Sequence, residues 1–182
     1  GAELGKVTDD FFLLCGAPAQ VAIVGGGYIA VELAGLLQAL GSRVTLLVRG
    51  DRLLERFDAE LTAQLAENLC HQGVKVHFNY RLRELRRDGD AVIAYGHDGP
   101  SDGHFDEVFF ATGRRGNSAG LGLEALGVEV GEKGEVIVDE WQTTAVPSVH
   151  AVGDIAGKVG LTPVAIAAAR KLKVRLFGGQ PH

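Results

Sequence analysis

The strongest fold signal in the chain is QVAIVGGGYIAVELAGLLQALGSRVTLLVR at residues 20–49. The apolar run at 21–24 is typical of a strand buried on both faces, and three glycines end it. Apolar residues then recur at helical spacing from Ile29 to Leu40, and Gly41 is placed to end the helix. Because a second apolar run follows at 44–48, this stretch predicts a strand–helix–strand unit.

The turn between this strand and helix has the spacing Gly25-x-Gly27-x-x-Ala30. At such a turn the first glycine permits a tight bend, the second lets a pyrophosphate approach the backbone, and the third position needs only a small residue. The free amides at the start of the helix face the anion. Since the pattern follows a strand, opens a helix and is closed by a second strand, we interpret it as a dinucleotide-binding turn.

Arginines follow the second strand of the unit. An NADP site offers arginine to the 2′-phosphate, whereas an NAD site usually carries Asp or Glu about twenty residues past the glycines. Arg49, Arg52 and Arg56 fit the first type, because a guanidinium meets a phosphate through paired hydrogen bonds. Asp51 remains an alternative partner for an unphosphorylated ribose. The sequence therefore favours NADPH over NADH.

Composition argues against several classes of partner. The chain has 182 residues, 46% of them hydrophobic, which is enough for one ordinary domain with an appendage. A formal charge of −5 and the absence of a long basic run argue against nucleic acid or an anionic membrane as partner. No apolar stretch approaches the length of a membrane span, and the first residues lack a secretory signal pattern, so we expect a cytoplasmic protein.

The two cysteines, Cys15 and Cys70, lie too far apart in sequence for a C-x-x-C redox or metal pair. We interpret each as a buried or free thiol, and we expect no metal site. The chain contains no methionine, so Gly1 is not expected to be a natural start. We expect the sequence to be part of a longer protein.

A helix and a strand are predicted directly after the arginine-containing loop. Asp58 is suited to cap the helix, Glu60 is favourable near the positive end of its dipole, and Gly73 is placed to end it. A short strand at 74–78 follows. Residues 1–19, before the first strand, are interpreted as a lead-in segment with no chemistry of their own.

The pattern then changes to antiparallel strands. Strands at 82–87 and 91–95 flank Asp88-Gly89, a hairpin signal, and residues 96–103 are expected to form a polar turn. An apolar strand at 107–111 returns to the first sheet. We therefore predict an α/β domain in which an antiparallel meander is inserted into a parallel sheet.

The remaining residues are too few for a complete second domain. A helix is predicted from Pro163 to Gly178 with Thr162 as its cap. Small strands are predicted at 128–130, 136–138 and 149–152. We place the first domain, which binds the nucleotide, at 1–115 and part of a second domain at 116–182.

Four blocks of the sequence resemble a known family. They are GGGYIAVELAG at 25–35, VRGDRLLERFD at 48–58, ATGRRGN at 111–117, and VHAVGDIAG with LTPVAIAAAR within 149–170. On these blocks the chain resembles the flavin-dependent pyridine nucleotide-disulfide oxidoreductases, most closely the glutathione reductase branch. The resemblance implies a Rossmann-like FAD/NAD(P)-binding domain at 1–115, followed at 116–182 by part of the central FAD-binding domain.

The resemblance also implies an activity and a set of NADPH-binding residues. Such enzymes pass reducing equivalents from NADPH through FAD to an active-site disulfide and then to oxidised glutathione. Tyr28 is implied to cover the flavin face and Glu32 to lie near the nicotinamide, with simple packing and a solvated charge as their respective alternatives. The residues implied to bind NADPH are Gly25, Gly27, Tyr28, Ile29, Ala30, Glu32, Arg49, Arg52, Arg56, Thr112, Gly113 and Arg114.

A second group of residues is implied to bind FAD: Gly153, Asp154, Leu161 and Thr162. Asp154 matches an aspartate that hydrogen-bonds the ribitol, although a turn-forming role is its alternative. The helix that begins near Thr162 matches one whose N-terminus faces the flavin, where its dipole would stabilise negative charge.

Two departures from the family limit what this chain is expected to do alone. Glu55 stands where the family commonly has a second arginine, which leaves Arg52 or Arg56, or Arg49 by itself, to contact the phosphate. The family's redox cysteine pair and catalytic histidine have no counterpart here, so no catalytic residue is expected. We expect this chain to bind NADPH weakly, to retain no FAD and to be a monomer, although the whole enzyme is expected to be a homodimer.

Two alternatives remain open from the sequence. Within the same class, the enzyme could reduce a different disulfide, with trypanothione reductase as the nearest rival. From another class, the chain could be a standalone nucleotide-binding or redox-sensing module.

Overall fold

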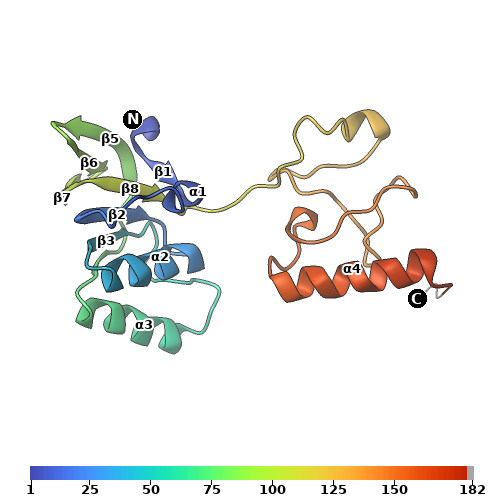
Figure 1. The fold of residues 1–182 in the computed structure, drawn as a ribbon, viewed down its shortest axis with the longest axis horizontal. Coiled ribbons are helices and arrows are strands. Elements are labelled where there is room, and N and C mark those ends of the chain that lie inside the picture. Colours follow the sequence, from blue (N-terminus) through green and yellow to red (C-terminus); the bar gives the residue numbers. More distant parts are fainter. Residues whose placement is uncertain (180–182) are drawn as a thin grey trace. The chain divides into compact units, whose positions relative to one another are not determined.

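The computed structural model describes residues 1–179, apart from the side chain of residue 102, and divides the chain into two compact units. The first unit is Gly1–Gly113 and the second is Arg114–His182. The first is built from strands and helices in layers, whereas the second consists mostly of loops with one long helix (Figure 1).

The first unit is organised around a five-stranded parallel sheet. Its strands lie in the order β1 (Lys6–Val7), β8 (Glu107–Phe110), β2 (Gln20–Val24), β3 (Arg43–Leu47) and β4 (Lys75–His77). Val24 of β2 pairs with Leu47 of β3 on one side and with Phe110 of β8 on the other. This register brings the carboxyl ends of three neighbouring strands to one edge of the sheet.

Two helices, α2 (Tyr28–Ala39) and α3 (Ala59–His71), lie on the same side of this sheet (Figure 1). Val21 and Ile23 of β2 belong to the hydrophobic cluster that also contains Leu37 of α2 and Leu69 of α3. The predicted cap of α3 is confirmed, because the Asp58 carboxylate accepts hydrogen bonds from the first amides of the helix. The predicted strand–helix–strand unit is therefore present.

An antiparallel sheet covers the opposite face. It consists of β5 (Leu82–Asp88), β6 (Ala91–Gly96) and β7 (Gly99–Phe105). Ala22 and Val24 of β2 pack in a second cluster with residues of this sheet, among them Val92 and Phe105. Alternate residues of β2 thus face different layers, which explains why its sequence is apolar throughout. The predicted meander inserted into a parallel sheet is confirmed.

One prediction for this meander is wrong. Residues 96–103 do not form a polar turn, because most of them belong to β7. Pro100 interrupts the strand signal in the sequence, yet β7 is an edge strand in the order β5-β6-β7, where an amide without hydrogen loses no bond to a further strand.

The lead-in segment also carries structure that its sequence did not predict. It contains η1 (Ala2–Leu4), β1 and the short helix α1 (Thr8–Phe11). The Nζ of Lys6 in β1 lies 2.5 Å from a carboxylate oxygen of Glu107 in β8. Phe11 packs against the helix-side core, whereas Phe12 is 81% exposed. Residues 1–19 therefore complete one edge of the sheet.

The second unit contains η2 (Glu124–Leu126), η3 (Asp154–Ala156) and α4 (Thr162–Phe177). The small strands predicted in this region are wrong: the described residues show only isolated bridges, Val130 with Val136 and Thr143 with His150. The predicted end of the last helix at Gly178 is confirmed, but Leu161 is the capping residue and Thr162 is already helical. The observed helix thus begins one residue earlier than predicted, a difference of the size by which definitions of helix ends commonly differ.

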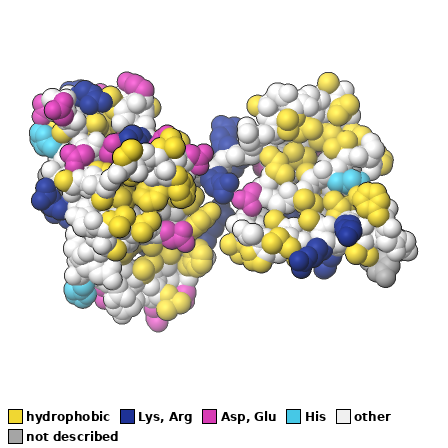
Figure 2. All heavy atoms as spheres, in the orientation of Figure 1, with side chains coloured by type: hydrophobic (Ala, Val, Ile, Leu, Met, Phe, Trp, Pro, Cys, Tyr) yellow, Lys and Arg dark blue, Asp and Glu magenta, His cyan; other side chains and the backbone are white. Residues whose placement is uncertain are grey.

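The helix α4 touches the rest of its unit through one narrow stripe. Its half-buried residues are Ala165, Ala168, Leu172 and Arg175, which share a helix face. An Nη of Arg175 donates to the carbonyl of Trp141 at 2.8 Å and to the hydroxyl of Thr143 at 2.7 Å. The rest of α4 is exposed, and hydrophobic side chains gather on the surface of this unit (Figure 2).

Candidate nucleotide-binding site

The first glycine of the turn after β2 is required by the fold. Gly25 has φ +140°, a conformation that L side chains rarely adopt. A Cβ at this position would lie 2.8 Å from the carbonyl carbon of Ala111 and would overlap its oxygen. The Gly25 amide donates to the carbonyl of Leu47 at 3.0 Å. Gly25 therefore lets the chain turn tightly between the ends of β3 and β8.

The other two glycines of the turn face different surroundings. A Cβ on Gly26 would lie 2.8 Å from a methyl carbon of Val48, so Gly26 is pressed against the end of β3. A Cβ on Gly27 would meet no heavy atom within 4 Å among the described residues. Glycine at 27 is thus not required by packing, and the space over it is open to a ligand that approaches the backbone.

The first turn of α2 continues this open surface. Gly27 is the capping residue and offers no side chain, so the first amides of the helix have no side-chain cap. Tyr28 is 48% exposed and Glu32 is exposed, whereas Ile29 is half-buried. Ala30 is fully buried, so the third position of the glycine pattern is small because it packs into the core. Uncapped amides at a helix N-terminus can bind a phosphate or pyrophosphate.

Arg49 projects from a backbone that is fixed on both sides. The carbonyl of Val48 accepts a hydrogen bond from the Tyr80 amide at 2.9 Å, and the carbonyl of Gly50 accepts one from the Asn79 amide at 2.8 Å. The Arg49 side chain is exposed and makes no ion pair within the described part of the chain. Its guanidinium is therefore available for an anion.

The two other arginines of this loop differ from each other. Arg52 is half-buried, and one of its Nη atoms donates to the backbone carbonyl of Glu55, which closes the turn. Arg56 is exposed and has no acidic partner among residues 1–179. Arg52 thus has a structural role in the loop through one of its five N–H donors, whereas Arg49 and Arg56 make no hydrogen bond or ion pair with other described residues.

The segment after β8 lies at the same edge of the sheet. The Ala111 amide donates to the carbonyl of Val24 at 2.8 Å, which places Ala111 beside the glycine turn. Thr112 and Gly113 follow and are exposed, with Gly113 at φ +138°. The first unit thus brings together the glycine turn, the start of α2, Arg49 and the end of β8.

The second unit holds the residues implied to bind FAD. Gly153 has φ +82° and lies against α4, because a Cβ on it would be 3.5 Å from that of Ala165. The Asp154 carboxylate lies beside the segment that precedes α4, 3.5 Å from the Cβ position of Gly160. Leu161 and Thr162 begin α4 and are exposed. The Gly-Asp element and the start of α4 are therefore neighbours within this unit.

An ion pair that the sequence did not predict joins Arg114 to Asp154. An Nη of Arg114 lies 3.2 Å from an Oδ of Asp154, and the two side chains are 65% and 47% exposed. The resemblance implies that Arg114 binds NADPH and that Asp154 binds FAD. No local pattern signals this pair, because the two residues are far apart in sequence.

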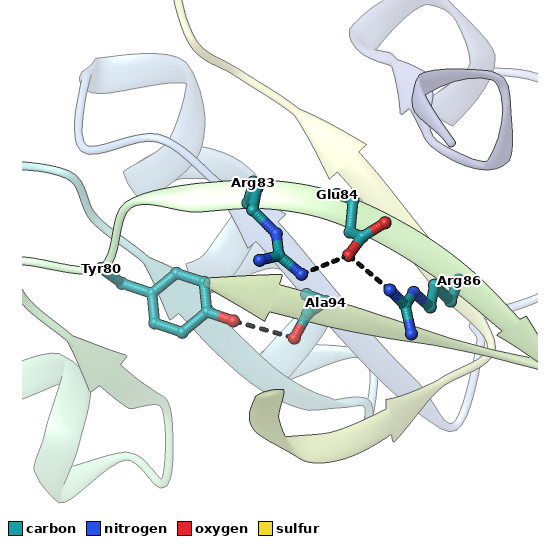
Figure 3. A network of polar contacts seen from close by, with 5 residues as sticks. All are labelled: Tyr80, Arg83, Glu84, Arg86 and Ala94. Atoms are coloured by element: carbon teal, nitrogen blue, oxygen red, sulfur yellow. Dashed lines mark hydrogen bonds and ion pairs between the residues drawn. The ribbon is translucent and has the colours of Figure 1, made fainter. Parts of the chain in front are cut away.

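A second cluster of charges lies on the antiparallel sheet (Figure 3). The Glu84 carboxylate accepts hydrogen bonds from Arg86 at 2.8 Å and Arg83 at 2.6 Å, and these bonds lower the pKa of Glu84 from its ordinary value. Arg86 also lies over the Tyr95 ring. Nearby, the Tyr80 hydroxyl donates to the carbonyl of Ala94 at 2.8 Å. The cluster pairs one carboxylate with two guanidinium groups, and the contact of Arg86 with Tyr95 joins β5 to β6.

The described residues offer neither a metal site nor a membrane span. No group of three His, Cys, Asp or Glu side chains there could hold a metal ion. Among residues 1–179 there is also no helix with the length and apolar character needed to cross a membrane.

Comparisons with known proteins identify the family. The pyridine nucleotide-disulphide oxidoreductase family matches residues 7–169. A glutathione reductase of Schizosaccharomyces pombe is 43% identical over 182 residues, a match that covers 98% of this chain and 39% of that protein. The chain therefore spans about two-fifths of the length of this relative.

Solved structures give the same result. The HOCl-induced flavoprotein disulfide reductase RclA of Escherichia coli matches with a TM-score of 0.91 and 27% identity, over 97% of this chain and 40% of that one. LpdA of Mycobacterium tuberculosis matches with a TM-score of 0.87 and 26% identity, over 96% of this chain and 38% of that one.

Proposed function

Because the chain belongs to the pyridine nucleotide-disulphide oxidoreductase family, we propose that it is the NADPH-binding part, with a portion of the FAD-binding part, of a flavoprotein disulfide reductase. We propose oxidised glutathione as the substrate of the whole enzyme, which the 43% identity to a glutathione reductase supports. The whole enzyme is proposed to be a cytoplasmic homodimer. The disulfide chemistry itself would need residues that this chain does not supply.

One observation carries the proposal for the nucleotide. The pairing of Val24 with Leu47 sets the glycine turn beside the loop that begins at Arg49. The turn offers open space over Gly27, and the loop offers an unpaired guanidinium. A ligand that carries a pyrophosphate and, one ribose away, a 2′-phosphate would meet both groups. This arrangement supports NADPH over NADH, which has the pyrophosphate but lacks the 2′-phosphate.

The residues of the first unit would divide the binding of NADPH among them. The amides of the first turn of α2 would hold the pyrophosphate, helped by the positive end of the helix dipole. Arg49 would pair with the 2′-phosphate through charge-assisted hydrogen bonds. Tyr28, on the exposed side of the same helical turn, is placed to cover a ring, and Glu32 follows one turn later.

The residues of the second unit would hold part of the flavin. Asp154 would accept hydrogen bonds from the ribitol, and the start of α4 would face the ring system. The Arg114 guanidinium lies 3.2 Å from the Asp154 carboxylate and would help to orient it. When bound, NADPH supplies a hydride and FAD carries the electrons on to a disulfide.

Calorimetric titration of the 182-residue chain with NADPH and with NADH tests the nucleotide proposal. The chain should bind NADPH more tightly than NADH. Arg49→Ala should weaken NADPH by about tenfold or more, since a hydrogen bond to a charged group contributes about 1.5–3 kcal/mol, and should leave NADH unchanged. Arg43→Ala, at the other end of β3, is the matched control and should change neither affinity. Equal binding of both nucleotides by the unmodified chain would contradict the assignment to NADPH.

A further inference from the structure

A small cavity lies at the amino-terminal edge of the parallel sheet, at the other end of the strands from the glycine turn. Its volume is about 120 Å³. Its lining includes Gln20, Arg43 and Lys75, which are the first residues of β2, β3 and β4, together with Phe105, the last residue of β7. Among the described residues of the lining two are basic and none is acidic, so the cavity is a candidate anion site.

The two basic residues reach the cavity from neighbouring strands and on the same face of the sheet. Val44 belongs to the helix-side cluster, so Arg43 and Thr45, which flank it on β3, face the antiparallel sheet. Lys75 of β4 pairs with Thr45 and therefore shares that face. Because adjacent strands lie about 4.8 Å apart, the two long side chains can contact one small ligand.

A glycine keeps space open beside Arg43. Two residues before the pair of Thr45 and Lys75 stand Arg43 on one strand and Gly73 on the other. A Cβ on Gly73 would meet no heavy atom within 4 Å among the described residues. Phe105, which is 2% exposed, contributes an apolar wall of the cavity. The cavity thus combines an apolar wall with open space next to the cations.

Neither cation is neutralised by a partner in the described part of the chain. Arg43 and Lys75 are exposed, and their side chains make no ion pair or hydrogen bond with other described residues. The carboxylate of Asp106, which follows Phe105, accepts a hydrogen bond from the Gln20 amide at 2.8 Å. The two positive charges beside the cavity are therefore available to a ligand, and they outnumber this one carboxylate.

We propose that this cavity binds a small oxyanion of the phosphate type between the Arg43 guanidinium and the Lys75 ammonium. A guanidinium offers paired N–H donors to two oxygens of such an ion, and an ammonium adds a compact charge. The Thr45 hydroxyl, which is also in the lining, supplies a further donor. The volume suits an ion or a single phosphate group, since drug-sized ligands occupy about 300–1,000 Å³. The site is separate from the proposed nucleotide site and does not depend on it.

Titration of the 182-residue chain with inorganic phosphate, followed by the NMR shifts of backbone amides at constant ionic strength, tests the proposal. The amides of Thr45, Gly73 and Lys75 should shift together with phosphate and not with chloride. Arg43→Gln and Lys75→Gln should each weaken phosphate binding by about tenfold or more, because each removes a charge-assisted hydrogen bond. Arg56→Gln, the matched control, removes an equal charge from an exposed residue beyond the other end of β3 and should leave these shifts unchanged.

Glycerol 3-phosphate in the same titration distinguishes a free ion from a phosphate group on a larger molecule. Tighter binding of the ester than of phosphate would indicate the larger molecule, and equal or weaker binding would indicate the free ion. Equal shifts with chloride, or shifts that persist in both cavity variants, would overturn the proposal. Phosphate-dependent shifts confined to the glycine turn and Arg49 would also overturn it, while leaving the proposed nucleotide site supported.

Discussion

The amide of Tyr80 donates a hydrogen bond of 2.9 Å to the carbonyl of Val48, the residue before Arg49. Tyr80 lies at the start of the antiparallel sheet, and its hydroxyl donates to Ala94 on β6. The position of Arg49 is therefore fixed by the layer that lies on the other face of the sheet from α2. In the proposed nucleotide site, the position of the arginine therefore depends on both layers.

Tyr80→Phe should distinguish the effect of the Tyr80 hydroxyl from the effect of its backbone amide. The substitution removes the hydroxyl and its bond to Ala94 but keeps the backbone bond to Val48. We expect a loss of about 1 kcal/mol in the free energy of unfolding and an unchanged NADPH affinity. Chemical denaturation and calorimetric titration measure the two quantities. A large loss of NADPH affinity would show that the side chain of Tyr80, rather than its amide, positions Arg49.

Gly27→Ala should affect binding more than folding. The new methyl group meets no heavy atom within 4 Å among the described residues, so the free energy of unfolding should fall by at most about 1 kcal/mol, the cost of a poorer helix cap. The same methyl occupies the space that a pyrophosphate would enter, and NADPH binding should weaken by about tenfold or more. Loss of NADPH binding without loss of stability is the expected result, and unchanged binding would argue against a ligand over Gly27.

Gly25→Ala is the contrasting substitution. Here a Cβ overlaps the carbonyl of Ala111 and the backbone is at φ +140°, so we expect a destabilisation greater than about 1 kcal/mol even without nucleotide. Thermal unfolding of the free chain measures it. A melting temperature equal to that of the unmodified chain would mean that the turn can relax around an added methyl group.

Phe109→Ala should destabilise the first unit strongly. Phe109 is fully buried on β8 and its ring meets that of Phe11 edge to face, at 6.3 Å between centroids. Removing a buried phenyl ring typically costs about 3–5 kcal/mol. Phe12→Ala is the matched control, because Phe12 is exposed, and it should change stability little. Similar losses in the two variants, measured by denaturant unfolding, would contradict this description of the core.

The pKa of Glu84 predicts a pH dependence of stability. Hydrogen bonds from Arg86, and then from Arg83, lower its pKa from 4.5 in the folded chain. The charged carboxylate therefore stabilises the fold above pH 4.5, and this contribution is lost as the pH falls through the lowered pKa. Glu84→Gln should be less stable than the unmodified chain at neutral pH and should converge with it in strong acid. A stability gap that does not change with pH would show that the charge of Glu84 is not involved.

Local signals made most of the first unit predictable. The strand before Gly25, the glycine turn, the cap at Asp58 and the hairpin at Asp88-Gly89 each depend on residues close in sequence. Their chemistry requires little tertiary context, because a turn glycine or a capping carboxylate acts on its own neighbours. These elements were accordingly found where the sequence placed them.

The features that were missed depend on partners distant in sequence. The two residues of β1 form a strand only because Phe109 and Phe110 of β8 lie beside them. The strand around Pro100 was interpreted as a turn, because nothing local shows that it would lie at an edge. The Glu55 carboxylate lies where a side chain at position 50 would be, and this position likewise exists only in the folded loop. Residue type suggested which side chains matter, but not which of them face one another.

Both hydrophobic clusters of the first unit contain residues of the strand β2, so the unfolding of the two layers is coupled. Val21 and Ile23 stabilise the helix side, while Ala22 and Val24 stabilise the antiparallel side, so neither layer can detach without exposing β2. The two layers should therefore melt as one cooperative block, and the amide hydrogens of β2 should exchange with solvent only through global unfolding. The strand that leads into the glycine turn would then be the last part of the unit to exchange.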